Sequence, residues 1–246
     1  MCVIRCNIPR DNVLDPKNPN SLRFRKITVE AFVNTNNPYP YNQYMLSALD
    51  SLLKLYPGRL VVAEYHRNTE QDTSEFHLNE NELLYQHYLD AVGSSLKGVP
   101  DVFLNGVDNR VQGASSVQSA LLRLQQVILS EMTKNSHFTI ELSYQLDSGR
   151  LKPEATLARL GSKDAENILL KAVLVSRMEK DNHKQVVRGS VKSNVIPALA
   201  HGEIETFTLP ELPVDESVFN RLIVYVTDQN EESIYQCESV EVEQVP

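Results

Sequence analysis

The chain has 246 residues, of which 41% are apolar and 23% charged, a composition typical of a globular protein and not of a disordered one. The formal net charge of −8 and the pI near 5.3 argue against nucleic acid or an anionic membrane as the main partner, because both repel an acidic protein. No apolar run approaches the roughly 20 residues that a spanning helix needs, so we expect no integral membrane segment.

The first quarter of the chain predicts a strand, a helix and a second strand. Residues 1–25 are proline-containing and polar, which predicts an irregular leader. Residues 26–33 predict a strand, and residues 39–56 predict a helix that Pro57-Gly58 ends. The apolar run at 59–66 predicts a strand buried on both faces, so the order is that of a βαβ unit with parallel strands.

A second helix is predicted near residues 79–92, and the nonamer Gly98 to Gly106 follows it. Val99-Pro100 is an X-Pro bond, for which a cis peptide costs little, and it leads into the short strand Val102-Phe103-Leu104. Asn105-Gly106 then predicts a type I′ hairpin turn. A third helix is predicted to begin at Ser115 or Ser116.

Beyond residue 130 the pattern changes from helices to short strands. Apolar and polar residues alternate strictly from Phe138 to Leu146, which predicts a half-buried strand. Further strand-like runs lie near 155–160, 168–177, 184–192, 203–209, 221–227 and 233–243. Strands at this spacing predict a β-sandwich, so we expect a leader at 1–25, an α/β domain at 26–132 and an all-β domain at 136–246.

The β-α-β order, the Val-Pro turn and the strand Val102-Phe103-Leu104-Asn105-Gly106 resemble the thioredoxin-like fold, as does Phe32 leading through a polar turn into the helix near Pro38. The whole chain resembles the Omp28-related group of thioredoxin-like proteins. Supporting stretches are residues 55–62, 64–66 and 222–229. This resemblance implies an α/β thioredoxin-like domain followed by an all-β immunoglobulin-like sandwich.

The resemblance also locates a site. The family has Cys-x-x-Cys at the start of the first helix, and alignment on Phe32 places those two positions at Asn37 and Pro40. Neither residue can exchange a disulfide. The residue before the cis-proline, Val99, is implied to present backbone groups that an extended peptide can pair with.

A peptide or protein surface is therefore expected around the former redox position. Tyrosine and proline offer apolar area at low entropy cost, although the same tyrosines could simply pack the helix start. Asp101 is predicted to be a turn cap or a polar contact to a ligand. The candidate binding residues are Asn37, Pro38, Tyr39, Pro40, Tyr41, Val99, Pro100 and Asp101.

The first functional hypothesis is a redox-inactive, non-enzymatic module that binds a protein or peptide or serves a structural role, without cofactor, metal or catalytic residues. The alternative is a thiol-disulfide oxidoreductase in which Cys2 and Cys6 fold back onto Asn37. The three intervening residues match neither a redox nor a zinc spacing, so free thiols are the favoured interpretation. The third cysteine, Cys237, makes an odd number that argues against a disulfide framework.

A third hypothesis is a hydrolase, because Glu64 and His66 point to one face of the predicted strand 59–66. The favoured interpretation is that local hydrogen bonds fix both side chains. His77 and His87 match no ligand spacing and are expected on a helix surface.

Compartment and assembly stay open. The chain as written begins without a signal-peptide core, which predicts a cytoplasmic protein. The family resemblance instead implies an extracytoplasmic setting, reached through a signal sequence upstream of a truncated start. Nothing in the sequence indicates an oligomeric state.

Overall fold

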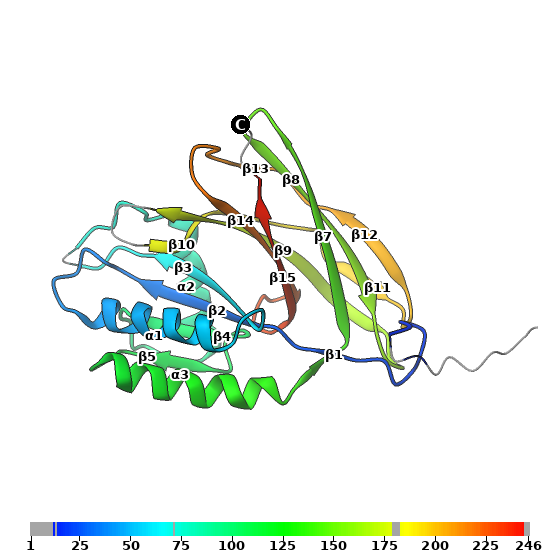
Figure 1. The fold of residues 1–246 in the computed structure, drawn as a ribbon, viewed down its shortest axis with the longest axis horizontal. Helices are drawn as coiled ribbons and strands as arrows, with labels where there is room; N and C mark the ends of the chain where they lie inside the picture. The colour runs from blue at the N-terminus through cyan, green and yellow to red at the C-terminus, as the bar shows by residue number, and fades with distance from the viewer. Residues whose placement is uncertain (1–11, 13, 71, 179–182, 244–246) are drawn as a thin grey trace, which may run out of the picture.

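The computed structural model describes residue 12 and residues 14–70, 72–178 and 183–243 (Figure 1). Cys2 and Cys6, in the first part of the predicted leader, lie outside the described residues. The elements of the first half are β1 (Arg23–Phe24), β2 (Ile27–Val33), α1 (Tyr41–Leu55), β3 (Leu60–His66), α2 (Asn79–Ala91), β4 (Asp101–Leu104), β5 (Arg110–Gln112) and α3 (Val117–Met132). This order confirms the predicted α/β half.

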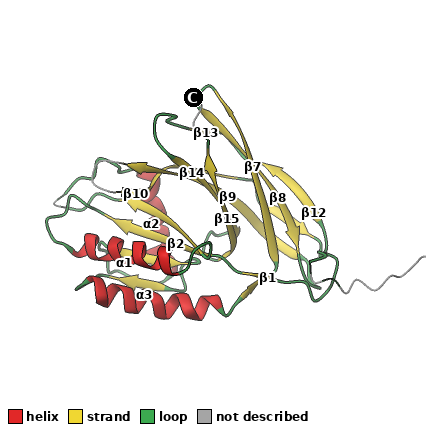
Figure 2. Ribbon diagram, viewed as in Figure 1, coloured by secondary structure: helices red, strands yellow, loops and turns green. Residues whose placement is uncertain are grey.

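The parallel β2–β3 pair and the antiparallel β2–β4 pair form the centre of this half. Both central strands are buried along their whole length, which explains their near-continuous apolar sequences. The α3 helix begins where Ser116 caps it, because the Ser116 hydroxyl accepts a hydrogen bond from the Ser119 N–H at 3.1 Å. The helices all lie in this half of the described chain (Figure 2).

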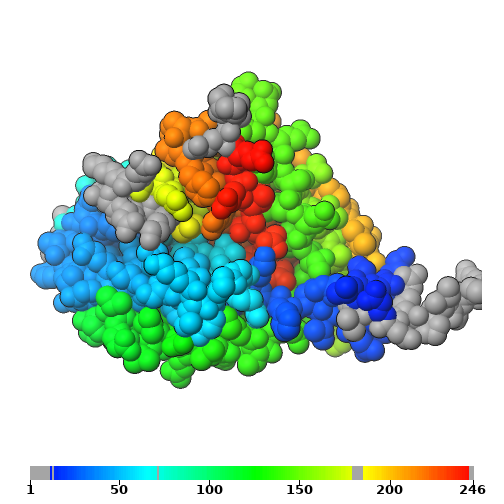
Figure 3. All heavy atoms as spheres, viewed as in Figure 1, coloured from blue at the N-terminus to red at the C-terminus, as the bar shows by residue number. Residues whose placement is uncertain are grey.

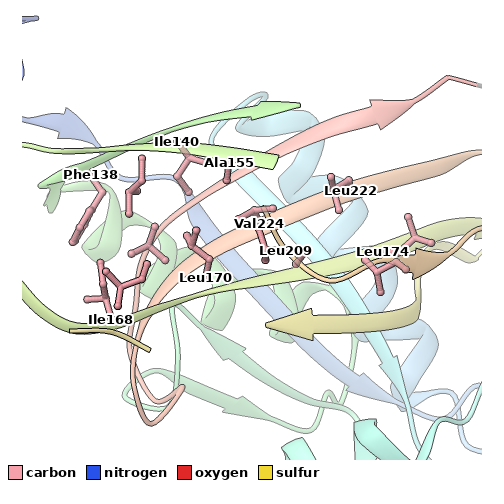
Figure 4. Close-up of a cluster of buried hydrophobic side chains, with 14 of the residues drawn as sticks. Phe138, Ile140, Ala155, Ile168, Leu170, Leu174, Leu209, Leu222 and Val224 are labelled. Atoms are coloured by element: carbon pink, nitrogen blue, oxygen red, sulfur yellow. The ribbon is translucent and has the colours of Figure 1, made fainter. Parts of the chain in front are cut away.

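The second half is built of strands, as predicted. They are β6 (Asn135–Ser136), β7 (Phe138–Asp147), β8 (Arg150–Arg159), β9 (Ala165–Met178), β10 (His183–Lys192), β11 (Ile196–Leu199), β12 (Ile204–Thr208), β13 (Leu212–Pro213), β14 (Asn220–Asp228) and β15 (Ile234–Val242). Strand β8 pairs with β7, β12 and β13 in one sheet, and β9 pairs with β14, β10 and β11 in the other. Apolar side chains of the two sheets interdigitate as the sandwich core (Figure 4).

One sheet runs through both halves of the chain. Its order is β15-β14-β9-β10-β3-β2-β4-β5, because β10 pairs in parallel with β3 where Val186 lies beside Glu64. The predicted division of the sequence near residues 132 to 136 stays a prediction. In space, backbone pairing joins the two halves, and β14 and β15, orange to red, lie between the α/β half and the green strands of the sandwich (Figure 3).

An apolar core lies against each face of the α/β part of this sheet. Helices α1 and α3 bury residues such as Leu49, Leu52 and Leu124 against one face. On the other face, α2 contributes Tyr85 and Tyr88. This second core also includes side chains from the sandwich strands, namely Val173, Val175, Val187, Ile223, Tyr225, Ile234 and Cys237. The halves therefore share apolar burial as well as a sheet.

Proline caused the main errors in the predicted strands. The run predicted at 155–160 is part of β8, which starts at Arg150 and contains Pro153, and β11 and β13 contain Pro197 and Pro213 and were not predicted. Pro153 is tolerated because its carbonyl accepts from Leu209 on the side where the partner changes from β12 to β13. Pro153 has no N–H to donate, and it lies between the residues of β8 that pair with β12 and those that pair with β13, so no hydrogen bond of either pairing is lost.

The predicted two-residue turn at Asn105-Gly106 is wrong in register. The β4–β5 pairing aligns Phe103 with Arg110, and Leu104 N–H bonds to the Asn109 carbonyl at 2.9 Å, so the loop is longer. Asn105 and Gly106 do adopt positive φ, 55° and 101°. They are held by a different partner, the loop between β14 and β15, through a bridge from Gly106 to Ser233.

Candidate functional site

The loop after β2 and the Val99-Pro100 turn lie at the same end of the sheet. Because β2 and β4 are antiparallel, the end of one lies beside the start of the other, with Phe32 opposite Asp101. The Val99-Pro100 peptide bond is cis, which confirms the sequence prediction. The end of β3, where Arg67 follows His66, reaches the same edge because β3 runs parallel to β2.

The loop at residues 34–37 is shaped by asparagine side chains. The Asn34 amide donates to the Asp72 carbonyl at 2.9 Å, and the Asn36 amide donates to the Thr73 carbonyl at 2.6 Å. Buried Asn42, in the first turn of α1, accepts from the Asn34 N–H at 3.2 Å. These side-chain hydrogen bonds hold the loop at residues 34–37 against residues 72–73, and no cysteine takes part.

Asn37 and Tyr39 lie directly before α1, which begins at Tyr41. The Asn37 amide donates to the Asp72 carboxylate at 3.1 Å, and its oxygen accepts from the Tyr39 N–H at 3.0 Å. This is an Asx turn. Pro40 is the N-cap residue of α1 and makes no side-chain cap.

Tyr39 and Tyr41 form an exposed aromatic pair. Their exposed fractions are 56% and 45%, and their rings stack with centroids 5.7 Å apart at 13°. Pro38 and Pro40 are exposed beside them. Tyr44, in contrast, packs half-buried against the core of the α/β half.

The Val99 backbone is available for pairing. Within the described residues, neither its N–H nor its carbonyl has a hydrogen-bond partner, and the residue is half-buried. The next residue outward is fixed: the Gly98 N–H donates to the Tyr85 hydroxyl at 3.0 Å, and the Gly98 carbonyl accepts from that hydroxyl at 3.1 Å. Tyr85 thus holds the turn and leaves the Val99 groups free.

Asp101 faces the interior, so neither predicted role holds. Its side chain is fully buried, and its carboxylate accepts from the Tyr85 hydroxyl at 2.8 Å and from Arg110 Nη2 at 2.6 Å. The hydrogen bonds and charge of Asp101, outweighing desolvation, raise the pKa of Arg110. Burial and the Asp101 charge raise the pKa of Tyr85 to about 12, so that hydroxyl stays a donor. Asp101 supports the cis-proline turn from inside.

A polar cavity of about 530 Å³ lies between the loop that holds Asn37 and the turn that holds Gly98. It is lined by Asn37, Arg67, Asn68, Thr69, Glu70, Glu82, Lys97 and Gly98. It therefore brings predicted residue Asn37 together with the residue before Val99. Tyr39, Tyr41 and Asp101 are not among its lining residues.

Arg67, which sequence reasoning missed, forms one side of this cavity. Its guanidinium lies 3.5 Å from the Tyr85 ring centroid and binds the Glu82 carboxylate through two bonds of 2.8 and 2.9 Å. A bidentate pair stacked on an aromatic ring is rigid. An arginine directly after a buried strand was the available signal, but its partner lies on α2, which local sequence does not place.

The Glu64 and His66 pair is internal. His66 is fully buried, with Nδ1 3.2 Å from the Ser74 hydroxyl, its ring against Phe76, and Nε2 3.8 Å from the Glu64 carboxylate. The favoured interpretation, fixation by local hydrogen bonds, fits this geometry. A substrate has no direct access to the imidazole, which the hydrolase hypothesis requires.

His77, His87 and the Cys237 thiol are not among the lining residues of the polar cavity. His87 lies on α2, where its Nε2 contacts the Asn230 carbonyl at 2.7 Å, and His77 contacts Asn79 at 3.3 Å. Cys237 is a free, buried thiol whose pKa burial raises. Over the described ranges, no group of three or more His, Cys, Asp or Glu is arranged to hold a metal ion, and no helix is long and apolar enough to span a membrane.

This architecture is a thioredoxin-like α/β part continued by an immunoglobulin-like β-sandwich. HBP35 of Porphyromonas gingivalis shares it: that structure aligns with 89% of this chain and 76% of its own, at a TM-score of 0.68 and 11% identity. A protein from Agrobacterium tumefaciens aligns with 91% of this chain and 97% of its own, at a TM-score of 0.58 and 16% identity.

These two matches establish the fold and confirm the recognised two-part architecture. A domain of the outer membrane lipoprotein Omp28 from Porphyromonas gingivalis also aligns, over 44% of this chain, at a TM-score of 0.31 and 15% identity, and this score is too low to support an argument. No family model matches the sequence, and no curated protein matches it.

Proposed function

We propose that the chain is a non-enzymatic, redox-inactive binding module that takes up an extended peptide segment of a partner protein at the Val99 wall. The observation that carries the proposal is the unpaired Val99 backbone beside the cavity that Asn37 and Gly98 line. An extended peptide supplies one donor and one acceptor to such a wall, which is the pairing used in strand addition.

The surroundings support a peptide and not a small substrate. The Tyr39–Tyr41 stack offers exposed aromatic area near the start of α1, which suits apolar side chains of a docked peptide. The cavity has both Glu70 and Lys97 on its lining, so it can meet polar side chains of either sign. Backbone pairing gives affinity and these side chains give selectivity.

The proposal includes no catalysis, because the chemically versatile groups nearby are turned inward. Asp101 is paired with Arg110, and His66 is fully buried. The positions that align with the family's dithiol hold Asn37 and Pro40. A thiolate nucleophile is therefore lacking at the usual position.

The test begins with short random peptides selected on the full chain, whose affinities are then measured by fluorescence anisotropy. Replacing Tyr39 and Tyr41 together by alanine is expected to weaken the selected peptides about tenfold or more, as removal of exposed aromatic anchors does. The matched control is Leu129→Ala on α3, since Leu129 is also exposed, at 50%, and is expected to bind as the native chain does.

Hydrogen exchange supplies the second measurement. Bound peptide is expected to slow exchange of the Val99 amide, because that N–H gains an acceptor. Peptides that bind the double variant as well as the native chain and leave Val99 exchange unchanged would refute the docking site.

An insulin-reduction assay separates the redox hypotheses. The proposal expects no turnover. Turnover that disappears when Cys2 and Cys6 are replaced by serine would establish the oxidoreductase alternative, and turnover that survives these replacements would refute redox inactivity altogether.

A further inference from the structure

A second cavity, of about 290 Å³, is lined by residues on or beside β6, β7, β8, β9 and β15. Its volume is at the lower end of the range of small-molecule sites, roughly 300 to 1,000 Å³. It is lined by Arg25, Asn135, Ser136, His137, Phe138, Arg159, Ala165, Glu166, Ile168 and Tyr235. The cavity is separate from the peptide site, with which it shares no lining residue.

Arg159 is a fixed cation at the wall of this cavity. Its Nε donates to the Lys163 carbonyl at 2.8 Å and its Nη1 to the His137 carbonyl at 3.2 Å. The guanidinium also lies 4.8 Å from the Phe138 ring centroid. Two backbone carbonyls and one ring therefore hold the group in one orientation, and rigid guanidinium groups are well suited to recognise carboxylates.

The charge of Arg159 is not neutralised within the described residues. It forms no ion pair with any of them, and its Nη2 makes no hydrogen bond to them. Burial lowers the pKa of Arg159, while the charge of Asp164, which is hydrogen-bonded to His201, opposes that effect. A partly desolvated guanidinium with a free N–H edge favours an anion.

The other polar groups around the cavity limit the ligand to a single negative charge. Arg25 is already paired, since its Nη1 binds Glu131 at 3.0 Å. Burial and the Arg159 charge lower the pKa of His137, so this ring is neutral at neutral pH. Glu166 is exposed on the lining and opposes anions.

The rest of the lining consists of Asn135, Ser136, whose hydroxyl already donates to the Tyr235 carbonyl at 3.1 Å, and a group of apolar or aromatic side chains. Phe138 and Tyr235 stack with ring centroids 5.9 Å apart, and Ala165 and Ile168 are buried beside them. The Tyr235 hydroxyl makes no hydrogen bond to the described residues, and burial, followed by the Asp228 charge, raises its pKa. It is thus a neutral donor with spare capacity.

We propose that this cavity binds a small monocarboxylate with a compact apolar body, its carboxylate on Arg159 Nη2 and its apolar part against Tyr235, Ala165 and Ile168. The Arg159 guanidinium selects a negatively charged ligand, and the volume of the cavity limits the size of that ligand.

Isothermal titration calorimetry of the full chain with benzoate tests the proposal. Saturable binding is expected with a Kd at or below about 1 mM, which suits a ligand of so few atoms. Benzamide, which has the same shape without the charge, is expected to bind at least about tenfold more weakly. Acetate and inorganic phosphate, which lack the apolar body, are expected to bind more weakly than benzoate.

Three variants locate the site. Arg159→Gln is expected to weaken benzoate about 10- to 100-fold, as loss of a charged hydrogen-bond donor does. Arg177→Gln is the matched control, because Arg177 also lies over a ring, that of Phe219 at 5.1 Å, away from the cavity; it is expected to leave binding unchanged. Glu166→Gln is expected to tighten binding about two- to fivefold.

Each contrary result has a defined meaning. The site is refuted if benzoate shows no saturable binding at about ten times the expected Kd, or if Arg159→Gln and Arg177→Gln behave alike. Equal affinity for benzamide would refute charge selection, and equal affinity for phosphate or acetate would refute the apolar contact. Should Arg159→Gln fail to fold, exposed Glu166→Gln still decides, because unchanged or weaker binding in that variant contradicts the proposal.

Discussion

Replacing Gly106 by alanine tests how the two halves are held together. Gly106 has φ of +101°, and a Cβ built there would lie 2.0 Å from the Glu232 carbonyl oxygen and 3.0 Å from the Ser233 Cα. Both neighbours are backbone, so the loop between β14 and β15 must move. That movement disrupts two bonds, Val107 N–H to Glu232 at 2.9 Å and Ile234 N–H to Asn105 at 3.1 Å.

The magnitude follows from these contacts. Alanine at positive φ costs about 1 to 2 kcal/mol, two backbone hydrogen bonds contribute about 1 kcal/mol each, and the stiffer unfolded chain returns about 0.5 kcal/mol. Gly106→Ala should therefore lower the free energy of unfolding by about 3 kcal/mol. Gly58→Ala is the matched control, because Gly58 also has positive φ, +70°, but its Cβ would meet nothing within 4 Å.

Urea unfolding followed by circular dichroism measures both variants. We expect Gly58→Ala to cost about 1 kcal/mol, leaving a difference of about 2 kcal/mol for the displaced loop. We also expect one transition for the native chain, since one core draws side chains from both halves. A difference between the variants below about 0.5 kcal/mol would show that the loop adjusts without losing its bonds.

Two further substitutions test buried charges. Burial raises the pKa of Glu30 above its ordinary 4.5, against the lowering effects of Lys171 and the Tyr88 and Tyr65 hydroxyls. The folded chain thus keeps this proton to higher pH than the unfolded chain, so the stability it gives is full below about 4.5 and lost as pH rises through the folded pKa. Glu30→Gln should cost less at pH 8 than at pH 5 in urea titrations, and equal costs would contradict the sign. Arg110→Met leaves the Asp101 carboxylate buried without its cation and should cost about 3 to 5 kcal/mol, measured the same way; a cost under about 1 kcal/mol would mean that Tyr85 suffices.

The sequence allowed the elements to be predicted wherever the signal was local. Apolar spacing located the three helices, and the buried runs at β2 and β3 located the parallel pair. The prediction was less accurate where a strand contains proline, as β8 does at Pro153, because the tolerance of that residue depends on which strand lies beside it. The β10–β3 pairing joins Val186 to Glu64 and has no local signal.

The candidate site, like the fold, was predictable from the sequence only in part. The cis bond at Val99-Pro100, which the structure confirms, and the placement of Asn37 and Pro40 at the family's dithiol positions followed from the resemblance of the sequence to thioredoxin-like proteins. The inward orientation of Asp101 did not, because it depends on Arg110 and Tyr85, which the fold brings to it. A charged side chain beside a turn can point into the protein or into solvent, and the groups that the fold places around it determine which.

The orientation of these side chains bears on what the site can do. A catalyst needs an acid, base or nucleophile that a substrate can reach, whereas the carboxylate of Asp101 and the imidazole of His66 are both fully buried. Their hydrogen bonds brace the sheet end from within, and Tyr85 extends that bracing to Gly98. Within the described residues, the Val99 amide and carbonyl have no hydrogen-bond partner, and the Tyr39 and Tyr41 rings are exposed. A rigid wall with unpaired backbone groups loses little entropy on pairing with a strand, so this bracing suits the peptide binding proposed above.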